Sequence, residues 1–159
     1  MPYRTRSEVE VTVRSLHPER QVRRLVISCY DDVGRRAPVH ALDVLVLDDA
    51  ASRARGVLGA TSWGELDGVL FWWPSGRRHL TFHTVGMRLP AIDLVGFRGI
   101  VGCRVWSEVP PDWSGIYFFG DAVLELPAGR ASRMGLPCVA LEGEPGLSFG
   151  ARLENDDVR

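Results

Sequence analysis

The stretch RRHLTFHTVGMRLPAIDLVGF, residues 77–97, decides how this chain is expected to fold. It begins with polar and apolar residues in alternation, which predicts a strand over His79–Val85. It ends in an apolar run, which predicts a second strand over Ile92–Phe97. The residues between them include Gly86 and Pro90, which are typical of loops. A strand, loop and strand in this order indicate a β-rich fold.

The rest of the chain has the same character, with short apolar segments separated by frequent turn signals. The further strands that this pattern predicts are Ser7–Leu16, Val22–Tyr30, Val39–Leu47, Val69–Trp73, Ile100–Val109, Ile116–Phe119, Ala122–Leu126 and Cys138–Leu141. One short helix is expected from an N-cap at Asp48 or Asp49 to Gly59, and a second is entered by Pro127. The fold class predicted is mainly β, an antiparallel sandwich or jelly-roll-like barrel with one or two short helices.

The length of 159 residues is that of one ordinary domain. No linker composition divides the chain, so residues 1–159 are expected to form a single domain. Within it, residues 1–40 are a possible N-terminal addition to a core spanning residues 41–141. Residues 142–159, rich in Gly, Pro and acidic residues, are expected to be a tail that frays.

The composition excludes several kinds of chemistry. All 19 basic residues are arginine, so neither a Schiff-base lysine nor a phosphate-loop lysine exists. The net charge of −1 gives no electrostatic footprint for nucleic acid. The three cysteines, Cys29, Cys103 and Cys138, form no C-x-x-C pair, so neither a zinc site nor a disulfide scaffold is indicated.

The N-terminal residues carry arginines without the apolar run of a signal peptide. No apolar run approaches the roughly 20 residues that a membrane-spanning helix needs. The sequence therefore predicts a cytoplasmic protein of a prokaryote with no membrane partner. Its oligomeric state is not predicted.

Four segments carry a resemblance to a known family. They are ARGVLGA (54–60), GVLFWW (68–73), HTVGMRLPAIDLV (83–95) and AVLELPAGRASRMGL (122–136). In this order and at these distances they resemble the domain of unknown function family 192, a group of small prokaryotic proteins. The resemblance covers residues 41–141 and implies a mainly β, jelly-roll-like sandwich. It implies no activity, because the family is uncharacterised.

The chain departs from the family pattern in three places. The turn GFRGIVG (96–102) is shorter than the family's hairpin turn and carries no acidic residue. The residues PCV (137–139) stand where the family usually has a Gly-Asp pair. The segment before Ala41 has no counterpart. A role carried by those turns or that acid in the family is therefore not transferred to this chain.

The polar residues of the opening stretch form the first candidate site. His83 would act as a general base oriented by Asp93, both as catalytic residues, if the two side chains shared one face. Thr84 and Arg88 would bind a ligand, the arginine through a carboxylate or an oxyanion. In a purely structural alternative, His83 and Thr84 cap a turn and Arg88 pairs with Asp93 to hold the loop.

Trp73 and Glu125 are further candidates for ligand binding. Trp72 and Trp73 are adjacent in a strand and must point to opposite faces, so at most one faces the interior. Glu125 lies within the apolar run VLELP and either faces solvent by alternation or is buried with a partner such as Arg55 or Arg88. The solvent-facing orientation is the expected one.

Neither a metal site nor a cofactor is predicted. His79 and His83 form an H-x-x-x-H motif, which would suit a metal ion only on a helix. On a strand their Cα atoms are about 13 Å apart, because a strand rises about 3.3 Å per residue. No glycine-rich nucleotide loop is present.

The leading functional hypothesis is binding of a small organic ligand in a pocket near the loop from His83 to Asp93. The first alternative is an enzyme of proton-transfer chemistry, an isomerase, cyclase or hydrolase, with His83 as base. The second is a protein-interaction module that uses a sheet edge or the aromatic loop around Trp113.

Overall fold

The computed structural model describes residues 9–30, 36–99, 101–136 and 148–153. These residues form nine strands and three short helices, so the mainly β fold is confirmed, with one helix more than expected. The helices are α1 (Val13–Leu16), α2 (Ala50–Arg55) and α3 (Arg130–Arg133). The strands are β1 (Val22–Tyr30), β2 (Arg36–Leu47), β3 (Gly68–Trp72), β4 (Arg78–Phe82), β5 (Ile92–Arg98), β6 (Val101–Val109), β7 (Ile116–Gly120), β8 (Ala122–Pro127) and β9 (Ser148–Leu153).

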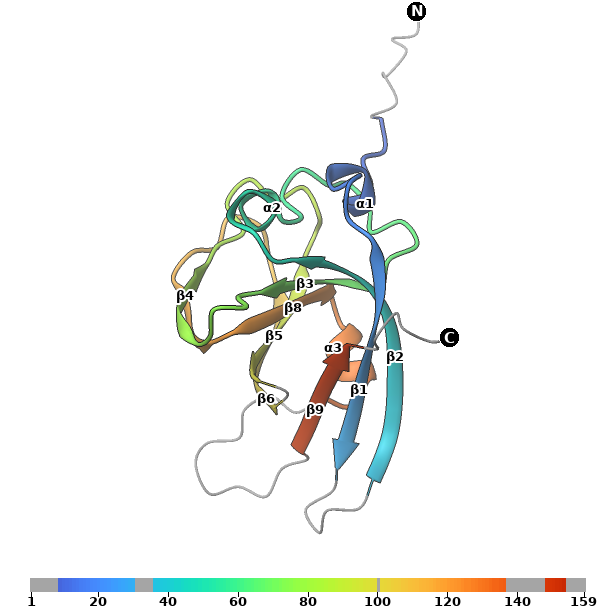
Figure 1. Ribbon diagram of the computed structural model, residues 1–159. Coiled ribbons are helices and arrows are strands. Elements are labelled where there is room, and N and C mark those ends of the chain that lie inside the picture. Colours follow the sequence, from blue (N-terminus) through green and yellow to red (C-terminus); the bar gives the residue numbers. More distant parts are fainter. Residues whose placement is uncertain (1–8, 31–35, 100, 137–147, 154–159) are drawn as a thin grey trace, which may run out of the picture.

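Seven strands form a strongly curved main sheet in the order β1-β2-β3-β8-β5-β6-β9. The sheet closes on itself because β9 pairs with β1 on one side and with β6 on the other. This last link is narrow, since β6 and β9 are paired only at Val101 and Gly150 among the described residues. Figure 1 shows the long strands β1, β2 and β9 side by side at one end of the molecule.

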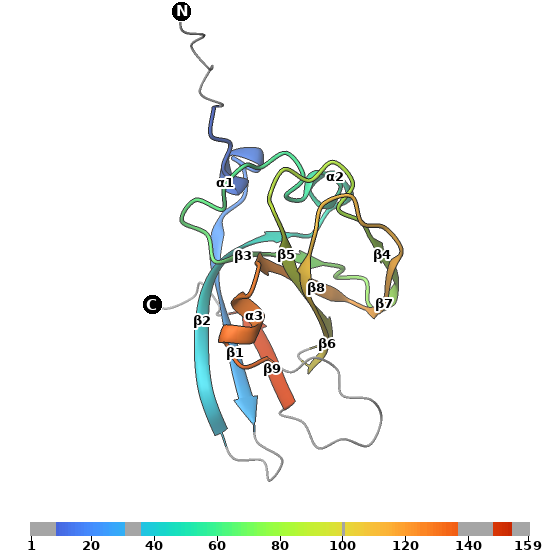
Figure 2. The ribbon, with the colours of Figure 1, turned by 180° about the vertical axis from the view of Figure 1, so that it is seen from behind.

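The second sheet consists of β4 and β7, paired antiparallel with Leu80 opposite Phe118. It lies at the end of the molecule away from β1 and β2, as Figures 1 and 2 show from opposite sides. Leu80 and Phe118 pack in the same apolar cluster as Phe71 of β3 and Leu94 of β5. The β4–β7 sheet therefore forms a second layer over the outer face of the main sheet.

One pair of neighbouring strands departs from the antiparallel arrangement that we expected. β2 and β3 run parallel, with Val44 opposite Gly68. The chain between them includes α2, and parallel neighbours need such a crossover connection. The main sheet is therefore mixed.

The central strands separate two apolar cores. Val95 and Phe97 of β5 face a core enclosed by the curved sheet, to which β1, β2 and α3 also contribute. Ile92 and Leu94 of the same strand face the second core, the outer core, which lies beneath the β4–β7 layer. Because side chains alternate between the two faces of a strand, a strand between two cores is apolar at almost every position.

The predicted strand Ser7–Leu16 is wrong in its described part. Val13–Leu16 is the helix α1, and the side chain of Thr12 caps it by accepting a hydrogen bond from the Ser15 amide. The alternation of Val9, Val11 and Val13 was misleading, because Val9 is exposed whereas Val13 is buried in the outer core. Thr12 lies three residues before the amide that it caps, and this N-cap favours a helix over a strand in this segment.

Parts of both terminal segments belong to the main sheet. β9 (Ser148–Leu153) lies within the predicted fraying tail, yet it pairs with β1 over six residue positions. β1 in turn lies within residues 1–40, and it pairs with β2 along its length. The predicted strand Cys138–Leu141 lies outside the described residues.

Replacing Gly120 by alanine is expected to lower the free energy of unfolding by about 1–3 kcal/mol. A Cβ on Gly120 would lie 2.5 Å from the Phe97 carbonyl oxygen and would overlap the Phe118 ring, so the two sheets would have to separate. Gly59→Ala is the control, since its Cβ would meet only Leu16 at 3.5 Å. Urea unfolding of both variants measures the effect, and equal stabilities would contradict this account.

Candidate functional site

A cavity of about 370 Å³ lies between α2, the β4 strand and the outer face of β3. This volume is at the lower end of the range of small-molecule sites. Its lining is mainly apolar and includes Ala54, Val57, Phe71, Phe82 and Ile92. Four of the six predicted site residues also line it, namely Trp73, His83, Thr84 and Glu125.

Glu125 is the most deeply buried of the charged or titratable residues that line this cavity, the others being Arg53 and His83. Only 6% of the residue is exposed, and Oε2 is buried without a hydrogen-bond partner among the described residues. Its strand, β8, runs between β3 and β5, where Glu125 is paired with Val69 and Leu94. Both neighbours belong to the outer core, so the carboxyl group points into apolar surroundings. The expected solvent-facing orientation of Glu125 is wrong.

Burial raises the pKa of Glu125 from 4.5 to about 8, because no nearby group compensates the lost hydration of the carboxylate. At neutral pH the side chain is therefore mostly a carboxylic acid, which can donate one hydrogen bond and accept others. Of its two predicted partners, Arg55 is engaged elsewhere, since its Nη1 donates to the Leu16 carbonyl and lies 4.0 Å from a carboxylate oxygen of Glu19. Arg88 is exposed and does not line the cavity.

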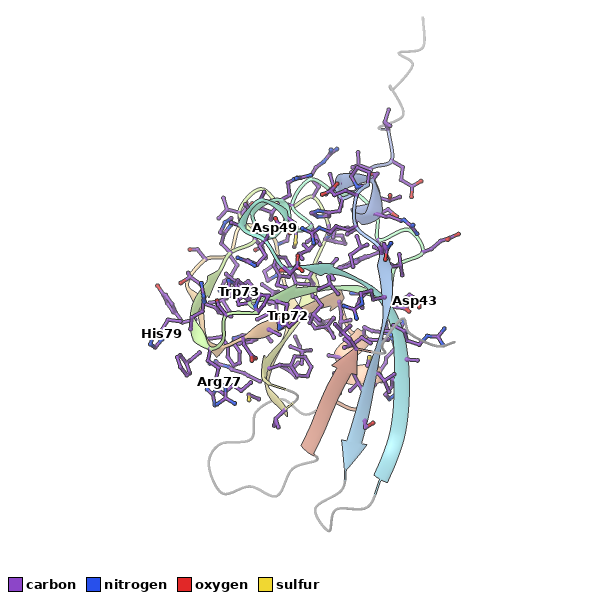
Figure 3. All side chains as sticks on the ribbon, in the orientation of Figure 1. Asp43, Asp49, Trp72, Trp73, Arg77 and His79 are labelled. Atoms are coloured by element: carbon purple, nitrogen blue, oxygen red, sulfur yellow. The ribbon has the colours of Figure 1, made fainter. Side chains whose placement is uncertain are left out.

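Arg53, which was not among the predicted site residues, is half-buried and lines the cavity at its mouth. The Arg53 guanidinium lies over the Trp73 ring, 4.8 Å from its centroid, and Nη1 donates a hydrogen bond to the Trp72 carbonyl. Figure 3 shows Trp72 and Trp73 together at the end of β3, below the start of α2 at Asp49. The predicted opposition of the two tryptophans is confirmed, since Trp72 packs on the enclosed core and Trp73 on the outer one.

Arg53 has charged neighbours of both signs. Burial lowers the pKa of Arg53, and the positive charge of Arg78 lowers it further, while Asp48 raises it. Asp48 itself is paired with Arg20. Arg53 forms no ion pair within the part of the chain that the structure describes. Its charge is therefore available to an anion entering the cavity.

His83 lies at the end of β4 with an exposed ring. Its Nδ1 accepts a hydrogen bond of 3.2 Å from the Val85 amide. This bond occupies the lone pair that a base would use, and it leaves the proton of a neutral ring on Nε2. In this geometry His83 holds the turn after β4 and presents a hydrogen-bond donor.

Thr84 connects two loops. Its hydroxyl donates to the Pro110 carbonyl at 2.6 Å and accepts from the Trp113 amide at 3.0 Å. The Thr84 amide donates to the Trp113 carbonyl as well. With its polar groups already bonded, Thr84 contributes shape to the cavity and no free hydrogen-bonding group.

Asp93 does not reach His83 as the predicted catalytic pair requires. Asp93 is fully buried, and its Oδ1 accepts from the Glu108 amide at 2.8 Å and its Oδ2 from the Ala131 amide at 2.9 Å. Asp93 therefore caps the start of α3, where the N-cap residue Gly129 has no side chain to do so. Neither Asp93 nor Arg88 lines the cavity.

A buried histidine positions the α2 side of the cavity. The Nε2 of His17 donates to the Gly56 carbonyl at 2.8 Å, directly after α2. Gly56 has a φ of +46°, and a Cβ there would lie 3.0 Å from the Phe71 ring. Glycine is required for this close approach, which sets the distance between α2 and β3.

Sequence reasoning missed Arg53 and Phe82 as lining residues. Arg53 lay in the predicted helix, where an arginine is usually solvated, and nothing in the sequence placed that helix over Trp73. Phe82 precedes His83 in the predicted strand. The alternation of apolar and polar residues there places Phe82 on the apolar face, and this signal could have identified it. Its ring contacts both Phe71 and Trp73 edge-on, with centroids 6.1 Å apart in each case.

Exposed aromatic side chains lie on the other side of the β4–β7 layer. Tyr117 and Phe119 of β7 point outward, and Trp113 stands in the preceding loop with half of its surface exposed. The His79 ring contacts the Phe119 ring at a tilt of 52°, and Figure 3 shows His79 and Arg77 at the outer edge of the molecule. This surface is where the protein-interaction alternative, which stays a prediction, would apply.

No cluster of three or more metal-ligating side chains occurs among the described residues. None of the helices in that same part of the chain is long and apolar enough to span a membrane.

No protein-family model matches this chain. No curated protein matches it either. The resemblance to the domain of unknown function family 192 therefore stays a prediction.

Two solved structures are similar to this one. A proposed transcription regulator from Sinorhizobium meliloti 1021 is 19% identical, with a TM-score of 0.59, over 89% of this chain and 98% of that one. A protein of unknown function from Novosphingobium aromaticivorans DSM 12444 is 17% identical, with a TM-score of 0.58, over 89% of this chain and 99% of that one. At these identities the likeness concerns the fold alone.

Proposed function

We propose that this protein binds a small organic ligand in the cavity between α2 and β3, with Glu125 as its polar anchor. The observation that carries the proposal is a buried carboxyl group in a mainly apolar cavity, whose Oε2 has no hydrogen-bond partner among the described residues. An unpaired buried polar group costs about 1–3 kcal/mol, and a ligand that bonds to it recovers part of that free energy. Ligand sites typically combine apolar walls with a few such polar groups.

Binding accounts for the site better than catalysis by His83. The catalytic alternative needs His83 as a base and Asp93 as its partner. In the structure, however, the Val85 amide donates to His83, and two other backbone amides donate to the Asp93 carboxylate. The binding proposal needs only the cavity and Glu125. The cytoplasmic location expected from the sequence is part of this proposal.

The test is to block the cavity from its rim. Ala54 is an exposed residue of α2 that lines the cavity, so Ala54→Trp should fill it without disturbing the core. Ala51→Trp is the matched control, since Ala51 is exposed on the same helix and does not line the cavity. Phenol, indole and benzamide serve as probes, followed by ¹H–¹⁵N shifts of the labelled protein.

The expected result is binding of at least one probe with shifts in α2, β3 and β8. This binding should be lost in Ala54→Trp and retained in Ala51→Trp. Absence of binding by all three probes, or equal binding by both variants, would contradict the proposal.

A further inference from the structure

The cavity has two polar ends of different character. Glu125 is buried at the inner end, where its Oε2 has no hydrogen-bond partner among the described residues. Arg53 stands at the mouth, where it is fixed by the Trp73 ring and the Trp72 carbonyl. The aromatic rings of Phe71 and Phe82 line the same cavity. The occupant should therefore differ in charge between its two ends.

The inner end favours a neutral group. Ionising Glu125 to pair with a cationic ligand would require two charges in an apolar site, and their desolvation opposes the attraction. A cation would also have to pass Arg53, which has Arg78 close enough to repel it. A neutral amide, carbonyl or phenol can instead form hydrogen bonds with the carboxylic acid without placing a charge in the apolar site.

The mouth favours an anion. The Arg53 guanidinium is held in place by its stacking and by one hydrogen bond, so little side-chain entropy is lost when it binds a carboxylate. Asp48 and Asp49, next to the start of α2, are both paired with Arg20. A ligand anion would therefore meet a guanidinium that forms no ion pair among the described residues.

We propose that the ligand is a small planar molecule with a neutral hydrogen-bonding group at Glu125 and an anionic group at Arg53. The aromatic walls fit a flat body, and a cavity of about 370 Å³ has room for one ring system with short substituents. This inference rests on the proposed binding function and specifies the class of ligand.

The experiment compares three probes that share one head and differ in charge: benzamide, 4-carbamoylbenzoate and 4-(aminomethyl)benzamide. A homologue, 4-carbamoylphenylacetate, extends the anion by one carbon. Dissociation constants are measured by ¹H–¹⁵N titration. We expect the better of the two anions to bind about tenfold tighter than benzamide, and the cation to bind more weakly than benzamide, as charge-assisted hydrogen bonds predict. The advantage of the anion should shrink when salt is raised.

Two variants assign the effect. Arg53→Met keeps the apolar stem and removes the charge, so it should abolish the advantage of the anion while benzamide binds as before. Arg55→Met is the control, because Arg55 lies on the same helix, bonds to Leu16 and does not line the cavity. It should leave the advantage of the anion unchanged.

The outcomes separate the two proposals. Binding of benzamide without a gain for either anion, or stronger binding of the cation, would overturn the ligand class and leave the binding site standing. If the Arg53→Met variant still binds an anion more tightly than benzamide, the proposed ligand class is overturned as well. Failure of every probe, including phenol and indole, would overturn the binding site itself and the ligand class with it.

Discussion

Replacing Glu125 by glutamine is expected to remove most of the loss of stability that this protein undergoes between pH 4.5 and about 8. The two limits are the usual pKa of the carboxyl group and the pKa that burial gives it in the folded chain. Glutamine has a similar shape and never ionises. The variant therefore separates the effect of charge from the effect of packing.

The sign follows from which state holds the proton. Below pH 4.5 the group is protonated in both states and costs no ionisation energy. As pH rises, the unfolded chain releases the proton first, so the free energy of unfolding falls by up to about 1.4 kcal/mol per pH unit. Above about pH 8 the folded protein ionises too, and the loss stops growing. At pH 7 the loss of unfolding free energy caused by Glu125 amounts to about 3 kcal/mol.

The measurement is urea unfolding of the wild-type protein and of Glu125→Gln at intervals from pH 4.5 to 8.5. The difference between their unfolding free energies should grow by about 3 kcal/mol from pH 4.5 to pH 7 in favour of the variant. Glu65→Gln is the control, because Glu65 is exposed. Parallel pH profiles for the wild-type protein and Glu125→Gln would show that Glu125 is ionised or solvated in the folded state.

Replacing Asp93 by alanine is expected to lower the free energy of unfolding by about 2–5 kcal/mol. The substitution leaves the buried Ala131 amide and the partly buried Glu108 amide without their acceptors, and the loss of an acceptor costs about 1–3 kcal/mol for a buried group. Glu108 is also held at a φ of +52°, which the bond to Asp93 helps to maintain. The loss should appear in the packing of α3 against β5.

His83→Ala is the matched comparison, because it changes the other member of the predicted catalytic pair. His83 is exposed and its one described hydrogen bond is local, so its removal should change stability by less than about 0.5 kcal/mol. Urea unfolding at pH 7 measures both variants. Similar losses for the two, or no loss in Asp93→Ala, would contradict a structural role for Asp93.

The strands could be predicted from the sequence because their signal is local. β1, β3, β5, β7 and β8 lie where apolar runs and turn residues placed them, since alternation and turn chemistry act over a few residues. The cap of α2 at Asp49 is equally local. The cap of α1 at Thr12 was also present in the sequence, but the valine alternation around it favoured a strand.

Glu125 shows where the local signal fails. Alternation predicts a solvent-facing side chain only when one face of the sheet is exposed to water. β8 is buried on both faces, because α2 and the β4–β7 layer cover the side that Glu125 occupies. The sequence marked this residue as unusual, and only the packing of the second layer made it a buried acid.

The sequence by itself determined the β-rich character of the chain, the places of most strands and a short set of polar residues worth testing. The tertiary structure alone decided which of those residues have partners. The two amides that bond to Asp93 lie 15 and 38 residues away along the chain; the pairing of β5 with β6 brings the first of them there, and the packing of α3 brings the second. His83 and Glu125 meet at one cavity for the same reason: sheet order and layer packing are long-range, and local sequence patterns do not encode them.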